Sequence, residues 1–384
     1  MMDVSIYLTP CKKKSGNFID GKIGHHIIEY NEDSFPEIHK NSIALISIPE
    51  NRGNNKNDNK KPYLFEDDFY QLHWRKKWNF EIYNLGVIIP GETINDSFIA
   101  LSEVMSFLIK KGCLPIVVGG TQDLTLAMYN AYEKLEQTIN TCAIDFRLDL
   151  GDIEKDATKD GFLSHLLIKR PCYLFNHSNI GFQAPHVNSK EIELFNKLYF
   201  DSCSLGEFNN NFKKAEPHLR NTDLISFDFN SIRKSDANYF ENNINGFYAE
   251  QACQISHYAG ISDKLSSIGF FNYDMEFASI ESNALIAELI WYFINGYSLR
   301  KGDYPIGNKK NYMKFSVNLQ KVNETIIFYK SDKSTRWWME VPHPPSEGRK
   351  YDRHYLVPCE KEDYDNAMKN EIPNLWWKTY QKLQ

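Results

Sequence analysis

The sequence lacks the features that mark a membrane protein, a disulfide-bonded protein or a nucleic-acid-binding protein. It contains no run of about 18 apolar residues and no basic segment followed by an apolar one at the N-terminus, so we expect no membrane insertion and no signal peptide. Its seven cysteines are scattered without a Cys-x-x-Cys pair, which indicates reduced thiols and predicts a cytoplasmic protein. A net charge of −6 gives no general attraction to nucleic acid.

What the sequence does contain is an alternation of strand-like and helix-like segments from residue 42 to residue 297. This alternation is typical of a mostly parallel sheet covered by helices. The first long helix is expected to begin at an Asp96 cap, to turn Ile99 and Leu108 inward, and to end at Gly112. The expected strands are 42–48, 85–89, 115–118, 141–146, 179–182, 224–229 and 267–271.

The composition changes after about residue 300. Residues 315–319 and 325–329 alternate like an antiparallel hairpin, 335–341 predict a third strand, and 362–383 predict one final helix. We therefore divide the chain into a main domain, 1–308, and a C-terminal extension, 309–384, packed on it.

The extension contains two tryptophan pairs, Trp337-Trp338 and Trp376-Trp377. Aromatic pairs so close in sequence more often anchor an appended segment than form a binding face, so we expect them to be buried. If they are exposed and contiguous, a partner-protein surface is the better interpretation.

Three of the predicted strands end in unusual polar segments. They are Val-Gly-Gly-Thr-Gln-Asp-Leu at 118–124, Ala-Ile-Asp-Phe-Arg-Leu-Asp at 143–149 and Ile-Ser-Phe-Asp-Phe-Asn at 225–230. Ligands of an open α/β sheet bind at the carboxyl ends of its strands, so these segments mark the candidate site.

Strand geometry predicts which of these side chains meet. Side chains at i and i+2 lie on the same side of a strand, so Asp145, Arg147 and Asp149 are expected to converge. The same alternation brings Asp228 and Asn230 together.

In order, spacing and context these segments resemble the ureohydrolases, the family of arginases, agmatinases and formimidoylglutamases. The corresponding family motifs are Gly-Gly-Asp-His-Ser, Asp-Ala-His-x-Asp and Ser-x-Asp-x-Asp. Supporting matches lie at 48–53, 245–250 and 270–274, so the resemblance covers about residues 40–300. It implies a three-layer α-β-α arginase-like fold with a mainly parallel, eight-stranded sheet, to which the small C-terminal β/α extension is added.

The resemblance also implies a chemistry. Family members hold two divalent ions, usually manganese, with four aspartates and two histidines, and a bridging hydroxide attacks the substrate carbon. In this chain the six corresponding positions hold an altered set. They are Gln122, Asp145, Arg147, Asp149, Asp228 and Asn230.

The replacements differ in their consequences. Gln122 and Asn230, in place of a histidine and an aspartate, still offer carbonyl oxygens to a hard cation. Arg147, in place of the second histidine, has no lone pair and stays positively charged. At an effective dielectric of ~20, two unit charges ~4 Å apart repel by about 4 kcal/mol, and a divalent ion roughly doubles that. Phe270 stands where the family has the glutamate that binds the substrate guanidinium.

We therefore predict an arginase-like pseudoenzyme that needs no cofactor and acts as a binding or scaffold component, with a protein partner or as a homo-oligomer. In this hypothesis the Arg147 guanidinium replaces the metals by pairing with Asp145, Asp149 and Asp228. The alternative is a manganese-dependent hydrolase of a linear amidine or guanidine C–N bond that uses those three aspartates and Gln122. A third possibility is a sensor that binds a small ligand at the same site.

Overall fold

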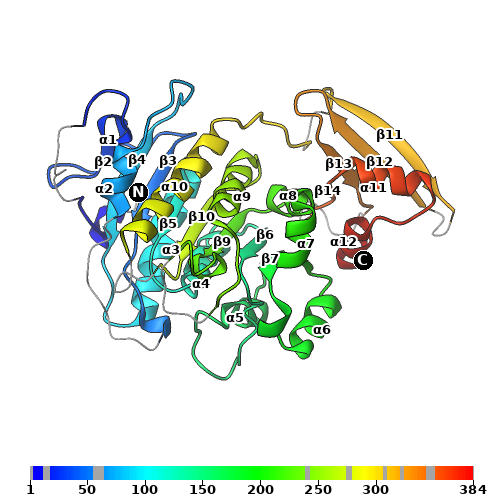
Figure 1. The fold of residues 1–384 in the computed structure, drawn as a ribbon, viewed down its shortest axis with the longest axis horizontal. Coiled ribbons are helices and arrows are strands. Elements are labelled where there is room, and N and C mark those ends of the chain that lie inside the picture. The colour runs from blue at the N-terminus through cyan, green and yellow to red at the C-terminus, as the bar shows by residue number, and fades with distance from the viewer. Residues whose placement is uncertain are drawn as a thin grey trace.

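A large sheet forms the centre of the computed structural model, which describes residues 3–11, 18–54, 65–237, 243–273, 279–305, 309–320, 324–342 and 351–383. Within these residues the sheet has ten strands in the order β1-β4-β3-β5-β10-β9-β6-β7-β8, with β2 beside β4 (Figure 1). The strands are β1 Leu8–Thr9, β2 Ile28–Glu29, β3 Ile43–Ser47, β4 Ile82–Ile88, β5 Leu114–Val118, β6 Ile139–Ile144, β7 Leu174–Phe182, β8 Asp201–Ser204, β9 Leu224–Asp228 and β10 Ser267–Phe271.

The pairings confirm a mainly parallel sheet. Strands β3 to β10 all pair in parallel, whereas β1 runs antiparallel to β4. The expected count of eight strands was too low, because the two-residue strands β1 and β2 add to the sheet at β4.

Helices cover both faces of this sheet, which confirms the three-layer arrangement. The helices are α1 Ile23–His26, α2 Phe65–Gln71, α3 Ile94–Lys111, α4 Leu124–Glu133, α5 Phe162–Ile168, α6 Ser189–Lys197, α7 Leu205–Asn210, α8 Glu216–Arg220, α9 Ala249–Ile261, α10 Ile280–Tyr297, α11 Lys361–Met368 and α12 Asn374–Leu383. Among the described residues, no helix is both long and apolar enough to cross a bilayer.

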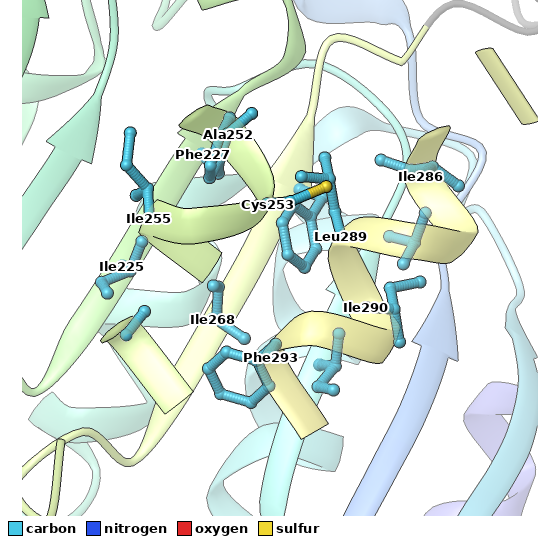
Figure 2. Close-up of a cluster of buried hydrophobic side chains, with 14 of the residues drawn as sticks. Ile225, Phe227, Ala252, Cys253, Ile255, Ile268, Ile286, Leu289, Ile290 and Phe293 are labelled. Carbon is cyan, nitrogen blue, oxygen red and sulfur yellow. The ribbon is translucent and has the colours of Figure 1, made fainter. Parts of the chain in front are cut away.

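Two buried apolar clusters hold the layers together. On one face, α9 and α10 pack on β9 and β10, where Ile255 and Phe293 lie against Ile225 and Ile268 (Figure 2). On the other face, α3, α4 and α5 enclose the second cluster. Burying apolar area on both faces makes the central strands uniformly apolar, which is why the sequence shows them as continuous runs.

The first long helix, α3, differs from its prediction at the start. Its N-cap is Thr93, and Asp96 is the third helical residue of a capping box, in which the Asp96 carboxylate accepts the Thr93 N–H at 2.8 Å. The predicted end at Gly112 is confirmed by that residue's left-handed φ of 73°. Leu108 is buried as expected, but Ile99 is 53% exposed and does not face inward.

The C-terminal extension contains a second, antiparallel sheet at one end of the molecule (Figure 1). Its strands, in order, are β11 Tyr312–Leu319, β12 Glu324–Ser331, β13 Trp337–Glu340 and β14 Leu356–Cys359. The predicted hairpin and third strand are confirmed, and β14 was not anticipated. The predicted single final helix is wrong: it divides into α11 and α12, because Pro373 disfavours helical backbone at the residue before it.

The extension is tied to the main domain partly through its tryptophan-containing segments. Trp337, Trp338 and Trp376 are buried, and the Trp376 Nε1–H donates to the Glu340 carbonyl at 2.9 Å, whereas Trp377 is 41% exposed. Arg220 of α8 donates from Nη1 to the Trp337 carbonyl at 3.0 Å and from Nη2 to the Cys359 carbonyl at 2.9 Å. Burial is therefore confirmed for three of the four tryptophans, and the Trp338 ring, 4.8 Å from the Arg220 guanidinium, contacts the main domain. The division at residue 308 remains a prediction.

Candidate functional site

The polar strand ends meet at one edge of the main sheet. Strands β5, β10, β9 and β6 are consecutive neighbours and run in parallel, so their carboxyl ends lie side by side. Each of the three predicted polar segments follows one of these strands, and the 270–274 segment follows the fourth. The last residue of that segment, Asp274, lies outside the described residues.

A tight glycine turn after β5 positions Gln122. Gly120 has a φ of 53°, and a Cβ there would lie 2.5 Å from the Glu50 carbonyl oxygen, so a side chain does not fit. The Gln122 N–H donates to Asn272 Oδ1 at 3.1 Å, and Asn272 Nδ2 donates to Asp228 Oδ1 at 2.8 Å. Asn272, which follows β10, therefore links the ends of β5 and β9.

Three aspartates form the buried acidic part of the site. Asp145 follows β6, Asp149 lies in the next turn with a φ of 52°, and Asp228 ends β9. Burial raises the pKa of all three, and the neighbouring Asp145 carboxylate adds to the rise in the pKa values of Asp149 and Asp228. The structure thus brings together the three aspartates that the sequence predicts to be neighbours.

Asp145 and Asp149 interact directly with each other. The Oδ2 atoms of both side chains are buried and receive no hydrogen bond from the described residues. The Asp145 carboxylate raises the pKa of Asp149, so a proton or a cation at this position would relieve the repulsion between the two carboxylates.

Arg147 does not play the role that we assigned to it. Strand β6 ends at Ile144, so the strand alternation no longer applies at residues 145–149. The main-chain N–H of Arg147 donates to Asp145 Oδ1 at 2.8 Å, but its guanidinium pairs with Asp160 and lies 4.7 Å from the centre of the Phe146 ring. The ion pair that the structure gives for this guanidinium is with Asp160, and not with one of the three aspartates for which we predicted it.

The remaining predicted positions serve backbone and core packing. The Asn230 N–H donates to Asp228 Oδ1 at 2.8 Å, from a short 3-10 turn that ends the strand alternation after Asp228. Phe270 is fully buried and its ring centre lies 5.5 Å from that of Phe227, within the cluster under α9 and α10. An apolar side chain at this position extends the core toward the site.

Sequence reasoning missed several polar residues of the same edge. Asp123 is fully buried and neither of its carboxylate oxygens has a hydrogen-bond partner among the described residues, so burial raises its pKa to about 7. The Lys159 charge lowers the pKa of Asp228, and the Asp160 charge raises that of Asp145. Asp123 lies within the first polar segment and could have been noticed. Lys159 and Asp160 come from a loop after β6 that no local pattern ties to the site.

Across the described ranges, no group of three His, Cys, Asp or Glu side chains is arranged to hold a metal ion.

Comparison with known proteins identifies the fold. No protein-family model matches the sequence. An uncharacterized 32.2 kDa protein from the hmfB 3′ region of Methanothermus fervidus is 37% identical over 79 residues, which is 20% of this chain and 27% of that protein. The chain thus matches about a quarter of that relative.

Solved structures are similar over much more of the chain. A Trypanosoma cruzi formiminoglutamase with Mn²⁺ has a TM-score of 0.59 at 16% identity, over 68% of this chain and 94% of that one. A Bacillus subtilis formimidoylglutamase has a TM-score of 0.64 at 14% identity, over 76% and 97%. The chain has the arginase-like fold. A B. subtilis arginase, with a TM-score of 0.55 at 14% identity over 66% and 98%, is similar in the same way.

Proposed function

We propose that this arginase-like chain is a pseudoenzyme, which uses its strand-end site for binding and does not carry out two-metal hydrolysis. The observation that carries the proposal is Arg147, whose permanently charged guanidinium stands at a histidine position and is paired with Asp160. A guanidinium has no lone pair with which to ligate a divalent ion, and it is not deprotonated in proteins.

The other donors do not fit two ions either. The main-chain N–H of Gln122 donates to Asn272 Oδ1, and Gln122 Oε1 accepts from Asn272 Nδ2. Asn272 Nδ2 also donates to Asp228 Oδ1. A pair of ions would have to displace the Asn272 bonds to Gln122 Oε1 and Asp228 Oδ1, with two amides and a guanidinium as replacements for charged or imidazole ligands. The chemistry of this donor set favours a site without two metals.

Metal analysis of the full chain tests the proposal. After incubation with Mn²⁺ and removal of free ions, we expect well below one manganese ion per chain by mass spectrometry. We expect no hydrolysis of arginine, agmatine or formiminoglutamate in the same preparation. Close to two manganese ions per chain, with activity, would refute the proposal.

One observation favours the alternative, a manganese-dependent hydrolase of linear amidine or guanidine C–N bonds. The Oδ2 atoms of Asp145 and Asp149 lack donors from the described residues, and carboxylate oxygens of this kind are ligands for a hard cation. Together with Asp228 and Gln122 they could hold a single ion, which would supply a Lewis acid when bound.

Substitution separates the alternative from the proposal. If the chain is a hydrolase, activity depends on added manganese and Asp228→Ala abolishes it, whereas Asp332→Ala, at an exposed aspartate of the β12–β13 turn, leaves it unchanged. If the site binds a small ligand as a sensor, a library of amidines and amino acids should contain a compound that raises the melting temperature of the wild type but not of Asp228→Ala. A protein partner or a homo-oligomer remains the predicted mode of action if no ligand is found.

A further inference from the structure

A second polar cavity lies at the opposite end of the sheet from the candidate site. Its walls include Leu114, where β5 begins, Ser266, directly before β10, and Arg353 of the C-terminal extension. The cavity has a volume of about 310 Å³, near the lower end of the range for small-molecule sites. The cavity therefore lies between the main domain and the extension. None of its lining residues belongs to the strand-end site.

The wall of this cavity carries more positive than negative charge. Three cationic side chains, Lys264, Arg300 and Arg353, line it. The lining carboxylate of Asp263 is already engaged, because its two oxygens accept the N–H groups of Gly302 at 3.0 Å and Asp303 at 2.9 Å.

A second carboxylate, Asp223, lies behind the wall and is also saturated. It accepts Arg353 Nη2 at 2.5 Å and the Asn140 N–H at 2.9 Å, and lies 3.7 Å from Lys264 Nζ. Three cations thus face two carboxylates, and one positive charge is left for a bound anion. Lys264 Nζ is buried, donates to Asn221 Oδ1 at 3.0 Å and to the Arg353 carbonyl at 3.4 Å, and faces Asp223, so it contributes charge and not a spare donor.

Spare donors come from the two arginines. Arg353 Nε is buried and has no hydrogen-bond partner among the described residues. Arg300 is fixed by bonds from Nε to the Gly260 carbonyl at 2.9 Å and from Nη2 to the Leu265 carbonyl at 3.0 Å. Its Nη1 makes no hydrogen bond to the described part of the chain. A buried donor without an acceptor costs free energy, which an anion at this position would recover.

We infer that this cavity binds a small organic anion, with a carboxylate or phosphate group between Arg300 and Arg353. Both groups carry at least two acceptor oxygens, so one group can accept a hydrogen bond from Arg353 Nε and another from Arg300 Nη1. The volume corresponds to roughly ten water molecules, which suits a compact di- or tricarboxylate or a small phosphate ester. The bound anion would join the extension to the main domain, because Arg353 belongs to one and Arg300 to the other.

Binding to the full chain tests this inference by calorimetry and thermal shift. The probes are inorganic phosphate and citrate, each compared with sodium chloride at equal ionic strength to separate binding from screening. Binding of phosphate alone identifies a phosphate site, and binding of citrate alone identifies a carboxylate site. Melting curves that coincide with those in sodium chloride for both probes would overturn the inference.

Variants locate the binding. Ile109→Trp places a large ring in the cavity wall and should abolish binding, while Ile99→Trp, on the solvent side of the same helix α3, should leave it unchanged. Arg353→Lys retains the charge but removes the Nε donor, so we expect at least about tenfold weaker binding. If Ile109→Trp does not fold, Arg353→Lys still decides, and equal affinity in Arg353→Lys and the wild type would contradict the proposed site.

Discussion

The raised pKa values of the neighbouring Asp145 and Asp149 carboxyl groups lead to a stability prediction that tests the site without any substrate. We consider Asp149→Asn in the metal-free chain. The substitution keeps the shape of the side chain, and asparagine tolerates the left-handed φ of 52° at this position. Its amide carries no charge at any pH and can donate a hydrogen bond to Asp145.

The magnitude follows from linkage. A carboxyl group whose pKa is raised on folding adds stability below its unfolded pKa, and this contribution is lost as pH rises through the folded pKa. The pKa of Asp145 rises from 3.8 to about 6, and that of Asp149 also rises. At about 1.4 kcal/mol per pKa unit, the rise in the pKa of Asp145 alone corresponds to about 3 kcal/mol above pH ~6. The pKa of Asp149 is raised by burial and by the Asp145 charge, so we expect Asp149→Asn to stabilise the fold by a similar amount, about 2–3 kcal/mol, at pH ~7.5 and by less than about 0.5 kcal/mol at pH ~4.

Urea denaturation in the presence of a chelator measures this difference. Asp332→Asn, in the exposed turn between β12 and β13, is the matched control and should change the free energy of unfolding by less than about 0.5 kcal/mol at both pH values. Equal effects of Asp149→Asn at the two pH values, or destabilisation at both, would refute the raised pKa of Asp149. Repeating the titration with Mn²⁺ adds a second result: selective stabilisation of the wild type would favour the hydrolase alternative.

Three further substitutions test the structure away from that pair. Asp223→Ala leaves the buried Lys264 ammonium and Arg353 without their carboxylate, so urea denaturation should show a loss of about 3–5 kcal/mol, and a loss under about 1 kcal/mol would contradict the buried ion pairs. Trp376→Ala empties the contact between α12 and the second sheet and should cost about 3–5 kcal/mol by far-UV circular dichroism. Gly120→Ala brings a methyl group to 2.5 Å from the Glu50 carbonyl in a left-handed turn, and should lower stability by about 2 kcal/mol or more in the same assay. An unchanged melting temperature would show that this turn can relax.

The central strands and their polar ends could be predicted because burial on both faces leaves a simple signal. Apolar runs such as 115–118 end abruptly at polar residues, and the parallel order brings those ends to one edge. Strand β8, Asp201–Ser204, escaped prediction because it is a short polar strand at the sheet edge. The residues of β8 form a strand because they pair with β7, and their composition alone does not predict a strand.

The orientation of Arg147 could not be predicted for a related reason. The i, i+2 rule needs an extended backbone, and whether β6 continues past Ile144 depends on its neighbours. The Asn179 side chain donates to the Arg147 carbonyl at 2.6 Å, and Asp160, which pairs with the guanidinium, lies 13 residues further along. The direction of such a side chain depends on interactions between separate segments of the chain. A local sequence pattern does not predict these interactions.

The bonds from Arg220 to the second sheet have a practical consequence for anyone who shortens this protein. Their acceptors are main-chain carbonyls of β13 and β14, so no side-chain exchange in those strands can remove them. A chain cut before residue 309 would retain this guanidinium on α8 and lose both acceptors together with the Trp338 ring that covers it at 4.8 Å. Truncation is thus a test of folding more than a test of function, and the role of the extension is better studied by point substitution in the intact chain.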